Sequence, residues 1–440
     1  MIRLLLVCIL SAISGLGQPP SDYADAASLV KSGQPAAAIP ILQRLLVASP
    51  ANLQARNLLG IAYLNSSRME DAAAQFKEAL RIDPNFQPAL KNLGVAEMAL
   101  GHRVEAKRNF ERFLKLNPTD PVAHLYMGEI SFADLHYSEA LSHYRQSQGL
   151  YLKDPPVVLH FARSAVECKQ YTAAIQTAEP LVRDHPKAEL YHLLGQAYDG
   201  AGRTQDAYNA LRTATQIDPQ DETNYLDLMS LCLAHENWAL SLEIADVALD
   251  RIAGSWRVRM QRGAVLAMQG RLEDAATEFT AAHRLAPDAS LPLVASAVLQ
   301  IERKQPELAV EALRAYRAGH PKDYLVEWFL GEALVQSGSP RQAVEPLREA
   351  VRLNPAAVPP RVLLGRLLAQ SGNSESAIRL FEEALKRNPN EVTAAYQLGL
   401  LYRKAGNVKR AEELMAKVGK ATSVPEAAPV SVRDLVRIVR

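Results

Sequence analysis

LQARNLLGIAYLNSSRMEDAAAQFKEALRIDP, residues 53–84, carries the pattern of small and apolar residues from which the fold can be inferred. Its first half carries Leu59, Gly60 and Tyr63 at i, i+1 and i+4, a spacing that places them on one face of an α-helix. Gly60 has no side chain, so a neighbouring helix can approach closely at that point. The first half therefore predicts a helix whose apolar face packs against a second helix.

The second half of the stretch predicts that second helix. Ala72, Phe76 and Ala79 recur at i, i+4 and i+7 and so share one helical face. Ala72 leaves room for close approach, and Phe76 fills the space beside it. Pro84 closes the unit, because proline disfavours the helical conformation in the residue before it. Residues 53–84 are therefore expected to form a helix–turn–helix hairpin.

The unit recurs along the chain with a period of 34 residues, which is the mark of a repeat architecture. Its closing prolines form two runs with this spacing: Pro50, Pro84 and Pro118, then Pro287, Pro321, Pro355 and Pro389. Between the runs lie Pro186 and Pro219, 33 residues apart. The predicted turn carries glycine at seven equivalent positions: Gly33, Gly101, Gly202, Gly270, Gly338, Gly372 and Gly406. Glycine readily adopts the left-handed conformation that ends a helix.

This pattern resembles the tetratricopeptide repeat, whose signature runs Leu-Gly-x-x-Tyr, then Ala-x-x-x-Phe-x-x-Ala, then Pro. About twelve units can be counted, from Ser21–Pro50 to Val392–Val418. The resemblance implies an all-α fold, an α-solenoid in which the hairpins form a right-handed superhelix. One hairpin cannot bury its own apolar faces, so neighbouring units share stability along the array. We expect Gly60, Gly195 and Gly365 to tolerate alanine but not leucine, because overpacking two close helices is destabilising.

The first residues predict export. Arg3 precedes the apolar run LLLVCILSAI at residues 4–13, and small residues follow up to Gln18. The run is too short to span a bilayer, which takes about 20 apolar residues. Residues 1–17 are therefore interpreted as a cleaved signal peptide of a secreted or periplasmic protein. A signal anchor and a wrongly assigned start are the alternatives.

The rest of the chain is divided into a repeat array and a short tail. Residues 18–418 are assigned to the repeat array and residues 419–440 to a short basic tail, which either caps the last repeat or stays free. No other segment is apolar enough to cross a membrane, so no span is expected after signal cleavage. The formal net charge of +1 provides no field to attract nucleic acid or an anionic membrane, and no nucleic-acid partner is expected.

No residue pattern points to catalysis, a cofactor or a metal. The chain has no glycine-rich phosphate loop, no GxSxG elbow and no HExxH motif. Its three cysteines, Cys8, Cys168 and Cys232, match no metal or redox spacing, and the last two are interpreted as small buried hydrophobes. Six of the ten histidines lie between residues 124 and 192, at repeat positions that differ from unit to unit, so they are expected to be scattered: His124, His136, His143, His160, His185 and His192. The chain is therefore predicted not to be an enzyme.

The resemblance implies that the first helix of each unit lines a concave groove. Transferring the groove positions onto units seven to ten gives an apolar, methionine-rich stripe for a helix or extended peptide of a partner: Leu226, Leu233, Met260, Met268, Val294, Val298, Ile301 and Trp328. The alternative is that tight coiling buries these residues against one another. The carboxylate clamp of chaperone-binding relatives is not expected, because Tyr23, Asn57 and Ile61 stand where its Lys/Asn/Arg set would lie.

Two functions remain open from the sequence. The first is a non-catalytic scaffold that binds proteins or peptides in the groove. The second is an accessory subunit that recognises the substrate of a separate enzyme, for example in a polysaccharide- or glycan-handling system. The sequence specifies neither the partner nor an oligomeric state.

Overall fold

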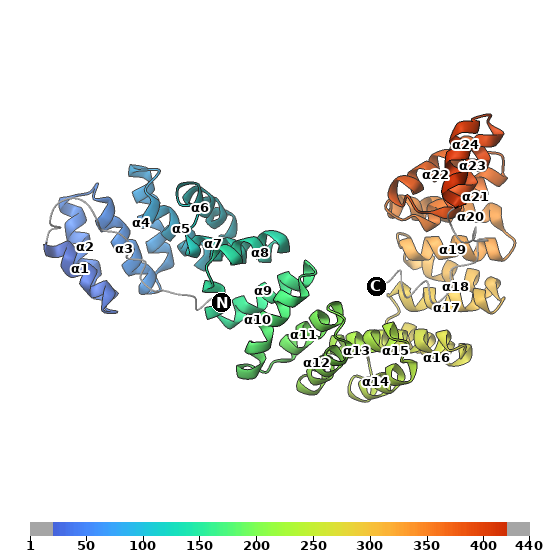
Figure 1. The fold of residues 1–440 in the computed structure, drawn as a ribbon, viewed down its shortest axis with the longest axis horizontal. Coiled ribbons are helices and arrows are strands. Elements are labelled where there is room, and N and C mark those ends of the chain that lie inside the picture. Colours follow the sequence, from blue (N-terminus) through green and yellow to red (C-terminus); the bar gives the residue numbers. More distant parts are fainter. Residues whose placement is uncertain (1–20, 420–440) are drawn as a thin grey trace. The chain divides into compact units, whose positions relative to one another are not determined.

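The structure, a computed structural model, describes residues 21–419. This part of the chain contains 24 α-helices, one short 3-10 helix and no strand, so the predicted all-α fold is confirmed (Figure 1). The predicted signal peptide at residues 1–17 and nearly all of the predicted tail at residues 419–440 lie outside the described residues. Within that range, no helix is both long and apolar enough to cross a membrane.

The helices belong to two compact units that divide after Ile217. Those of the first unit are α1 (Ser21–Lys31), α2 (Pro35–Ala48), α3 (Leu53–Asn65), α4 (Met69–Ile82), α5 (Gln87–Ala99), α6 (Arg103–Leu116), α7 (Pro121–Ala133), α8 (Tyr137–Gln146), η1 (Leu150–Lys153), α9 (Pro155–Glu167), α10 (Tyr171–Asp184), α11 (Ala188–Gly200) and α12 (Thr204–Ile217). Each α-helix packs against the next one along the chain, which gives six stacked hairpins. The 3-10 helix η1 follows the fourth hairpin, where the closing proline is replaced by Leu152.

The second unit is built in the same way. Its helices are α13 (Glu222–Ala234), α14 (Trp238–Arg251), α15 (Trp256–Met268), α16 (Leu272–Leu285), α17 (Ser290–Glu302), α18 (Pro306–Gly319), α19 (Tyr324–Gln336), α20 (Pro340–Leu353), α21 (Pro359–Gln370), α22 (Ser374–Arg387), α23 (Val392–Lys404) and α24 (Val408–Val418). One continuous hydrophobic core runs from α15 to α24. The array is thus a solenoid of hairpins within each unit, as the period of 34 residues predicts.

The turn inside each described hairpin uses one left-handed residue at the same repeat position. The seven glycines predicted for this role all have positive φ, between 74° and 85°. In the five other hairpins the position is taken by residues with a side chain and φ between 56° and 62°: Ser67, Leu135, Lys169, Glu236 and Lys304. The left-handed turn thus recurs at this position of every described hairpin, including five in which the residue is not glycine.

A side chain near the start of the first helix ties several hairpins to the loop before them. In each case it donates a hydrogen bond to the carbonyl oxygen of the closing proline, six residues earlier. The pairs are Arg56 with Pro50 (2.6 Å), His124 with Pro118 (2.8 Å), Tyr225 with Pro219 (3.4 Å) and Arg361 with Pro355 (2.8 Å). The hydrogen bond satisfies a carbonyl at the joint between hairpins, where no helix supplies a partner.

Candidate partner-binding surface

The eight residues predicted to line a groove all lie on first helices of hairpins in the second unit. Leu226 and Leu233 are on α13, and Met260 and Met268 are on α15. The other four lie on α17 and α19: Val294, Val298, Ile301 and Trp328. First helices touch each other in two pairs, α13 with α15 and α17 with α19, so four of the residues lie on each pair.

The four residues on α17 and α19 are buried. Trp328 is 1% exposed, and its ring lies 4.6 Å from the ring of Phe329 and 5.9 Å from that of Tyr324. Val294 and Val298 have no exposed surface, because α17 packs against both α18 and α19. The expectation that these four residues face an open groove is wrong, and the alternative of burial by tight packing describes them.

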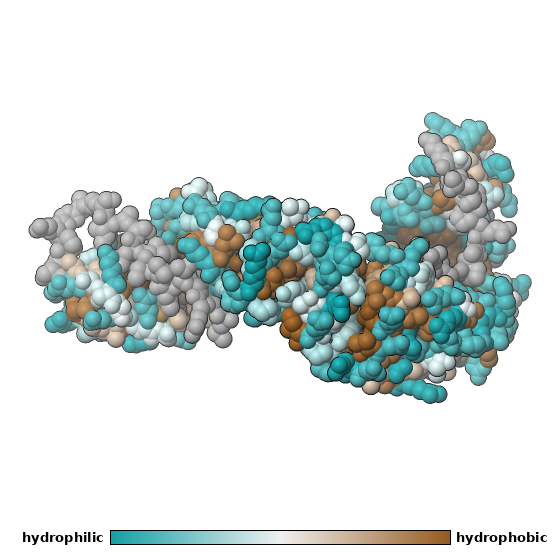
Figure 2. Space-filling model, turned by 60° about the horizontal axis from the view of Figure 1, so that its bottom comes forward, coloured by the Kyte–Doolittle hydropathy of each residue, from teal (hydrophilic) through white to brown (hydrophobic). Residues whose placement is uncertain are grey.

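The four residues on α13 and α15 keep part of their surface in solvent. Leu226, Leu233, Met260 and Met268 are half-buried, and Met260 packs on the edge of the core. Figure 2 shows how hydropathy is distributed over one face of the molecule. Hydrophilic residues cover much of this surface, and hydrophobic residues are gathered between them. We call these four residues the apolar strip.

A hydrogen-bonded glutamine holds the two helices of the apolar strip together. Gln261, next to Met260, donates from Nε2 to the Ser230 hydroxyl at 2.8 Å and to the carbonyl oxygen of Leu226 at 3.3 Å. These contacts place the start of the strip on α15 beside its start on α13. Amide hydrogen bonds of this kind fix the register of the two helices without covering their apolar side chains.

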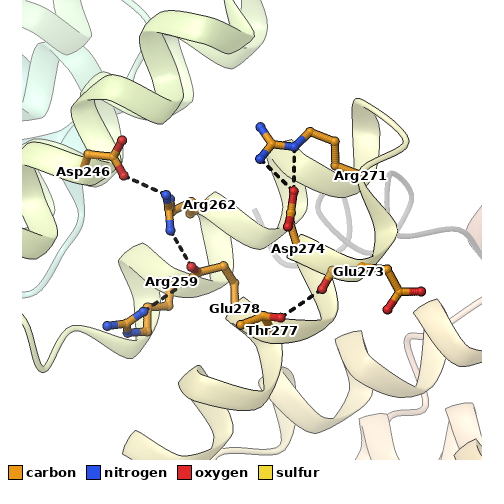
Figure 3. Close-up of polar contacts among 8 residues, drawn as sticks. All are labelled: Asp246, Arg259, Arg262, Arg271, Glu273, Asp274, Thr277 and Glu278. Atoms are coloured by element: carbon orange, nitrogen blue, oxygen red, sulfur yellow. Dashed lines mark hydrogen bonds and ion pairs between the residues drawn. The ribbon is translucent and has the colours of Figure 1, made fainter.

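A cluster of ion pairs joins α15 to α14 and α16. Arg262 pairs with Asp246 of α14 at 2.8 Å and with Glu278 of α16 at 2.5 Å, and Arg259 also reaches Glu278 (Figure 3). Glu278 is buried and accepts both arginines, so its charge is compensated. The sequence signal for this cluster is Arg262 itself, which precedes Gly263 where most other units have an apolar residue before glycine.

Buried carboxylates lie farther along the same unit. Glu327 of α19 is 1% exposed, and burial raises its pKa although Arg317 Nε lies 2.7 Å from Oε1 and opposes the shift. Burial also raises the pKa of Glu332, which accepts a hydrogen bond from Gln336 at 3.3 Å. Both groups are held between packed helices, and neither belongs to the apolar strip.

The histidine-rich part of the first unit is more organised than expected. His124 and His143 meet with their Nδ1 atoms 2.9 Å apart, so the expectation of scattered histidines is wrong for this pair. His160 Nδ1 lies 3.0 Å from a carboxylate oxygen of buried Glu129, which also accepts a hydrogen bond from Tyr144 at 2.7 Å. Across residues 21–419, no three His, Cys, Asp or Glu side chains are grouped to hold a metal ion.

The two described cysteines are free thiols. Cys232 is buried, as predicted, and burial raises its pKa to about 11, which disfavours the reactive thiolate. Cys168 is only half-buried, so the prediction of a buried residue is wrong there. The Cys232 environment is that of a packing residue.

Models of the tetratricopeptide repeat match four segments of the chain, which together span just over half of it. One model matches residues 23–85, 295–358 and 362–424, and a second matches residues 188–221. A comparison with curated proteins gives no significant match.

Among solved structures, yeast Tom70 is similar over 95% of this chain and 94% of its own, with 16% identity and a TM-score of 0.48. The APC/C hetero-tetramer Cut9-Hcn1 is similar over 94% of both chains, with 12% identity and a TM-score of 0.42. A repeat protein from Parabacteroides merdae ATCC 43184 is similar over 56% of this chain and 98% of its own, with 15% identity and a TM-score of 0.44.

Proposed function

The chain belongs to the tetratricopeptide repeat family. We propose that it is a non-catalytic scaffold whose first helices bind a protein or peptide. We also propose that all twelve hairpins are repeats of this family. Stacked hairpins provide a long, continuous surface, which suits binding of an extended segment or a helix. The proposal concerns protein partners only, in line with the balanced charge of the chain.

The observation that carries the proposal is the apolar strip. Its leucines and methionines lie at the surface of α13 and α15, although equivalent apolar residues on α17 and α19 are buried. Methionine side chains are flexible and polarizable, so they adapt to the shape of a partner. We therefore place the binding site on α13 and α15, and exclude Val294, Val298, Ile301 and Trp328 from direct contact.

The strip is tested by capture of the partner from the native host. Leu226→Glu with Met260→Glu is expected to weaken capture at least about tenfold, because a desolvated apolar contact becomes a buried charge. Val247→Glu is the matched control, since Val247 is 53% exposed on α14 of the same unit. Capture that survives in the strip variant as well as in the control would move the site elsewhere.

The identity of the captured protein distinguishes the two functional classes. A structural or export component supports the scaffold. An enzyme that handles polysaccharides or glycans, bound in a fixed ratio, supports the accessory subunit instead. Mass spectrometry of the captured material, with the strip variant as background, separates the two outcomes.

We also propose that the protein is exported and acts in the periplasm or outside the cell. The support is the apolar run at residues 4–13 after Arg3, followed by small residues before Gln18. Intact-mass measurement of protein from the native host is expected to show a chain that begins at Gln18. A full-length chain that begins at Met1 and stays in the cytoplasm would refute export.

A further inference from the structure

The fourth hairpin brings two histidines together. His124 stands near the start of α7, and His143 lies on α8, 19 residues later. Their Nδ1 atoms are 2.9 Å apart, and the centres of their rings are 5.2 Å apart. His124 is buried and His143 is half-buried, so the pair lies where the packed interior meets the surface.

The contact between these two repeat positions recurs along the array. In two other hairpins the side chains at the same positions, again 19 residues apart, are hydrogen-bonded: Arg56 with Gln75 at 3.3 Å and Arg259 with Glu278 at 3.2 Å. Only the fourth hairpin carries histidine at both positions. The two imidazoles therefore occupy a point where the first and second helices of a hairpin meet in other units as well.

The hydrogen bonds assign the protons of the two rings. His124 Nε2 lies 2.8 Å from the carbonyl oxygen of Pro118, which can only accept, so Nε2 carries hydrogen. In the neutral ring Nδ1 of His124 is then bare, and it accepts the hydrogen bond from Nδ1 of His143. Histidines that bind a metal commonly donate their other ring N–H to a backbone carbonyl in this way. His124 is thus arranged to coordinate a metal through Nδ1.

His143 is available as a second ligand at neutral pH. Burial lowers its pKa and the neighbouring His124 lowers it further, so the neutral ring predominates. Two charged groups act on this ring in opposite senses: Glu139, one helical turn earlier on α8, favours a bound cation, and Lys107 of α6 opposes it. Within residues 21–419 no third His, Cys, Asp or Glu side chain completes a metal-binding group with the pair.

We propose that His124 and His143 bind a copper(II) ion through their Nδ1 atoms, with water in the remaining positions. Copper(II) prefers a square-planar or tetragonal arrangement, in which neighbouring ligands subtend about 90°. With metal–imidazole bonds of about 2.0–2.1 Å, two such nitrogens lie about 2.8–3.0 Å apart, which matches the observed 2.9 Å. A tetrahedral zinc ion would need about 3.3–3.4 Å. Nickel(II) shares the square-planar geometry but binds more weakly than copper(II).

The bound ion joins α7 to α8. It lies to one side of the line between the two nitrogens, so both rings turn toward it, and the proton of His143 moves from Nδ1 to Nε2. No proton is released when both rings start neutral. Because the ion bridges the two helices of the folded hairpin, it also raises the thermal midpoint of the protein.

Titration of the full chain, without an affinity tag, with copper(II) sulfate tests the proposal. Isothermal titration calorimetry is expected to show one ion per chain at the strongest site, and electron paramagnetic resonance should show coupling to two nitrogens. His143→Gln should weaken binding at least about tenfold and leave one coupled nitrogen. His143 is the decisive position, because His124→Gln also removes the hydrogen bond to Pro118 and needs a check of its fold by circular dichroism.

The matched controls are His136→Gln and His185→Gln, because both of these histidines are exposed. Binding that persists in the controls and weakens in His143→Gln and His124→Gln supports the proposal. Loss in His143→Gln and His136→Gln, with retention in His124→Gln, would overturn it, because the exposed face of α8 would then be the site. Unchanged affinity in His143→Gln, or tighter binding of zinc than of copper, would overturn it as well.

Discussion

A β-carbon built on Gly60 of α3 would lie only 2.4 Å from Cε1 of Phe76 on α4. The same contact recurs in other hairpins, where the equivalent β-carbon distances from the ring are 2.8 Å for Gly94 with Phe110, 2.6 Å for Gly263 with Phe279 and 2.8 Å for Gly365 with Phe381. Real β-carbons essentially never come within 3.0 Å of another heavy atom. The aromatic ring of the second helix thus occupies the side-chain space of the first.

This contact corrects the expectation that alanine is tolerated at these glycines. A β-carbon on Gly195 would lie 2.5 Å from Cγ of Leu211, so Gly195→Ala is expected to destabilise the protein by about 1–3 kcal/mol and Gly195→Leu by more. Urea denaturation midpoints provide the measurement. Gly254→Ala is the control, because nothing lies within 4 Å of that position. Equal midpoints for the two alanine variants would refute the close contact.

The left-handed turns predict stabilising substitutions. Leu135 has φ 61° and its side chain is 67% exposed, so Leu135→Gly relieves backbone strain and removes little packing. We expect a gain of about 0.5–1 kcal/mol, after allowing for the extra entropy that glycine loses on folding. Gly338→Ala, at φ 76°, should shift the denaturation midpoint in the opposite direction. A lower midpoint for Leu135→Gly would show that the turn is unstrained.

Trp328→Ala is expected to act on folding. A buried tryptophan that is cut back to alanine leaves a cavity and typically costs about 3–5 kcal/mol, so the denaturation midpoint should fall sharply. Met260→Ala, at the half-buried strip, should lower the midpoint much less. If Trp328→Ala lost partner capture while its midpoint stayed unchanged, the original assignment of Trp328 to the groove would be restored.

Glu327→Gln is expected to stabilise the protein at neutral pH. Burial raises the pKa of Glu327 in the fold, so the folded state favours the protonated form and ionisation costs stability as the pH rises above the ordinary pKa of about 4.3. Glutamine resembles the protonated form, so the midpoint of the variant should exceed that of wild type at about pH 7 and match it near pH 4. Glu345→Gln, at an exposed position on α20, should change little. A lower midpoint at neutral pH would mean that the Arg317 pair outweighs burial.

His143 predicts a loss of stability in mild acid. Burial, and then the neighbouring His124, lower the pKa of His143 in the fold, so the unfolded chain binds a proton first as the pH falls below about 6.5. His143→Gln should make the decrease in thermal midpoint between about pH 7.5 and 5.5 shallower. His185→Gln is the control, because His185 is exposed. Identical pH profiles for wild type and His143→Gln would contradict this assignment.

Local patterns in the sequence predicted most of the fold. The i, i+4 and i+7 spacing around Phe76 and the recurring prolines depend on residues that lie close in the chain, and both helices of the hairpin follow from them. The turn at Lys304 is different, because lysine carries no preference for the left-handed conformation. Lys304 joins α17 to α18, and these two helices pack against each other. The left-handed conformation accompanies that packing, which the residue type at the turn does not predict.

The candidate surface was predictable only in part for a similar reason. Repeat position indicates which side of the first helix faces its neighbours, and this placed Met260 and Trp328 on equivalent sides. Exposure depends on how closely the next helix approaches, and α19 packs against α17 so that Trp328 is buried. The clash between Gly195 and Leu211 likewise depends on distances of tenths of an ångström, which no periodicity specifies.

The hydrogen bond to the closing proline can be formed by side chains of different chemistry. Arg56, His124 and Tyr225 differ in charge and shape, yet each reaches the carbonyl six residues before it. We therefore expect exchange of one donor for another, such as arginine for tyrosine, to keep this hydrogen bond while it removes a positive charge from the joint. Substitutions at this one position can thus change the surface charge of a single hairpin while the stacked helices keep their arrangement.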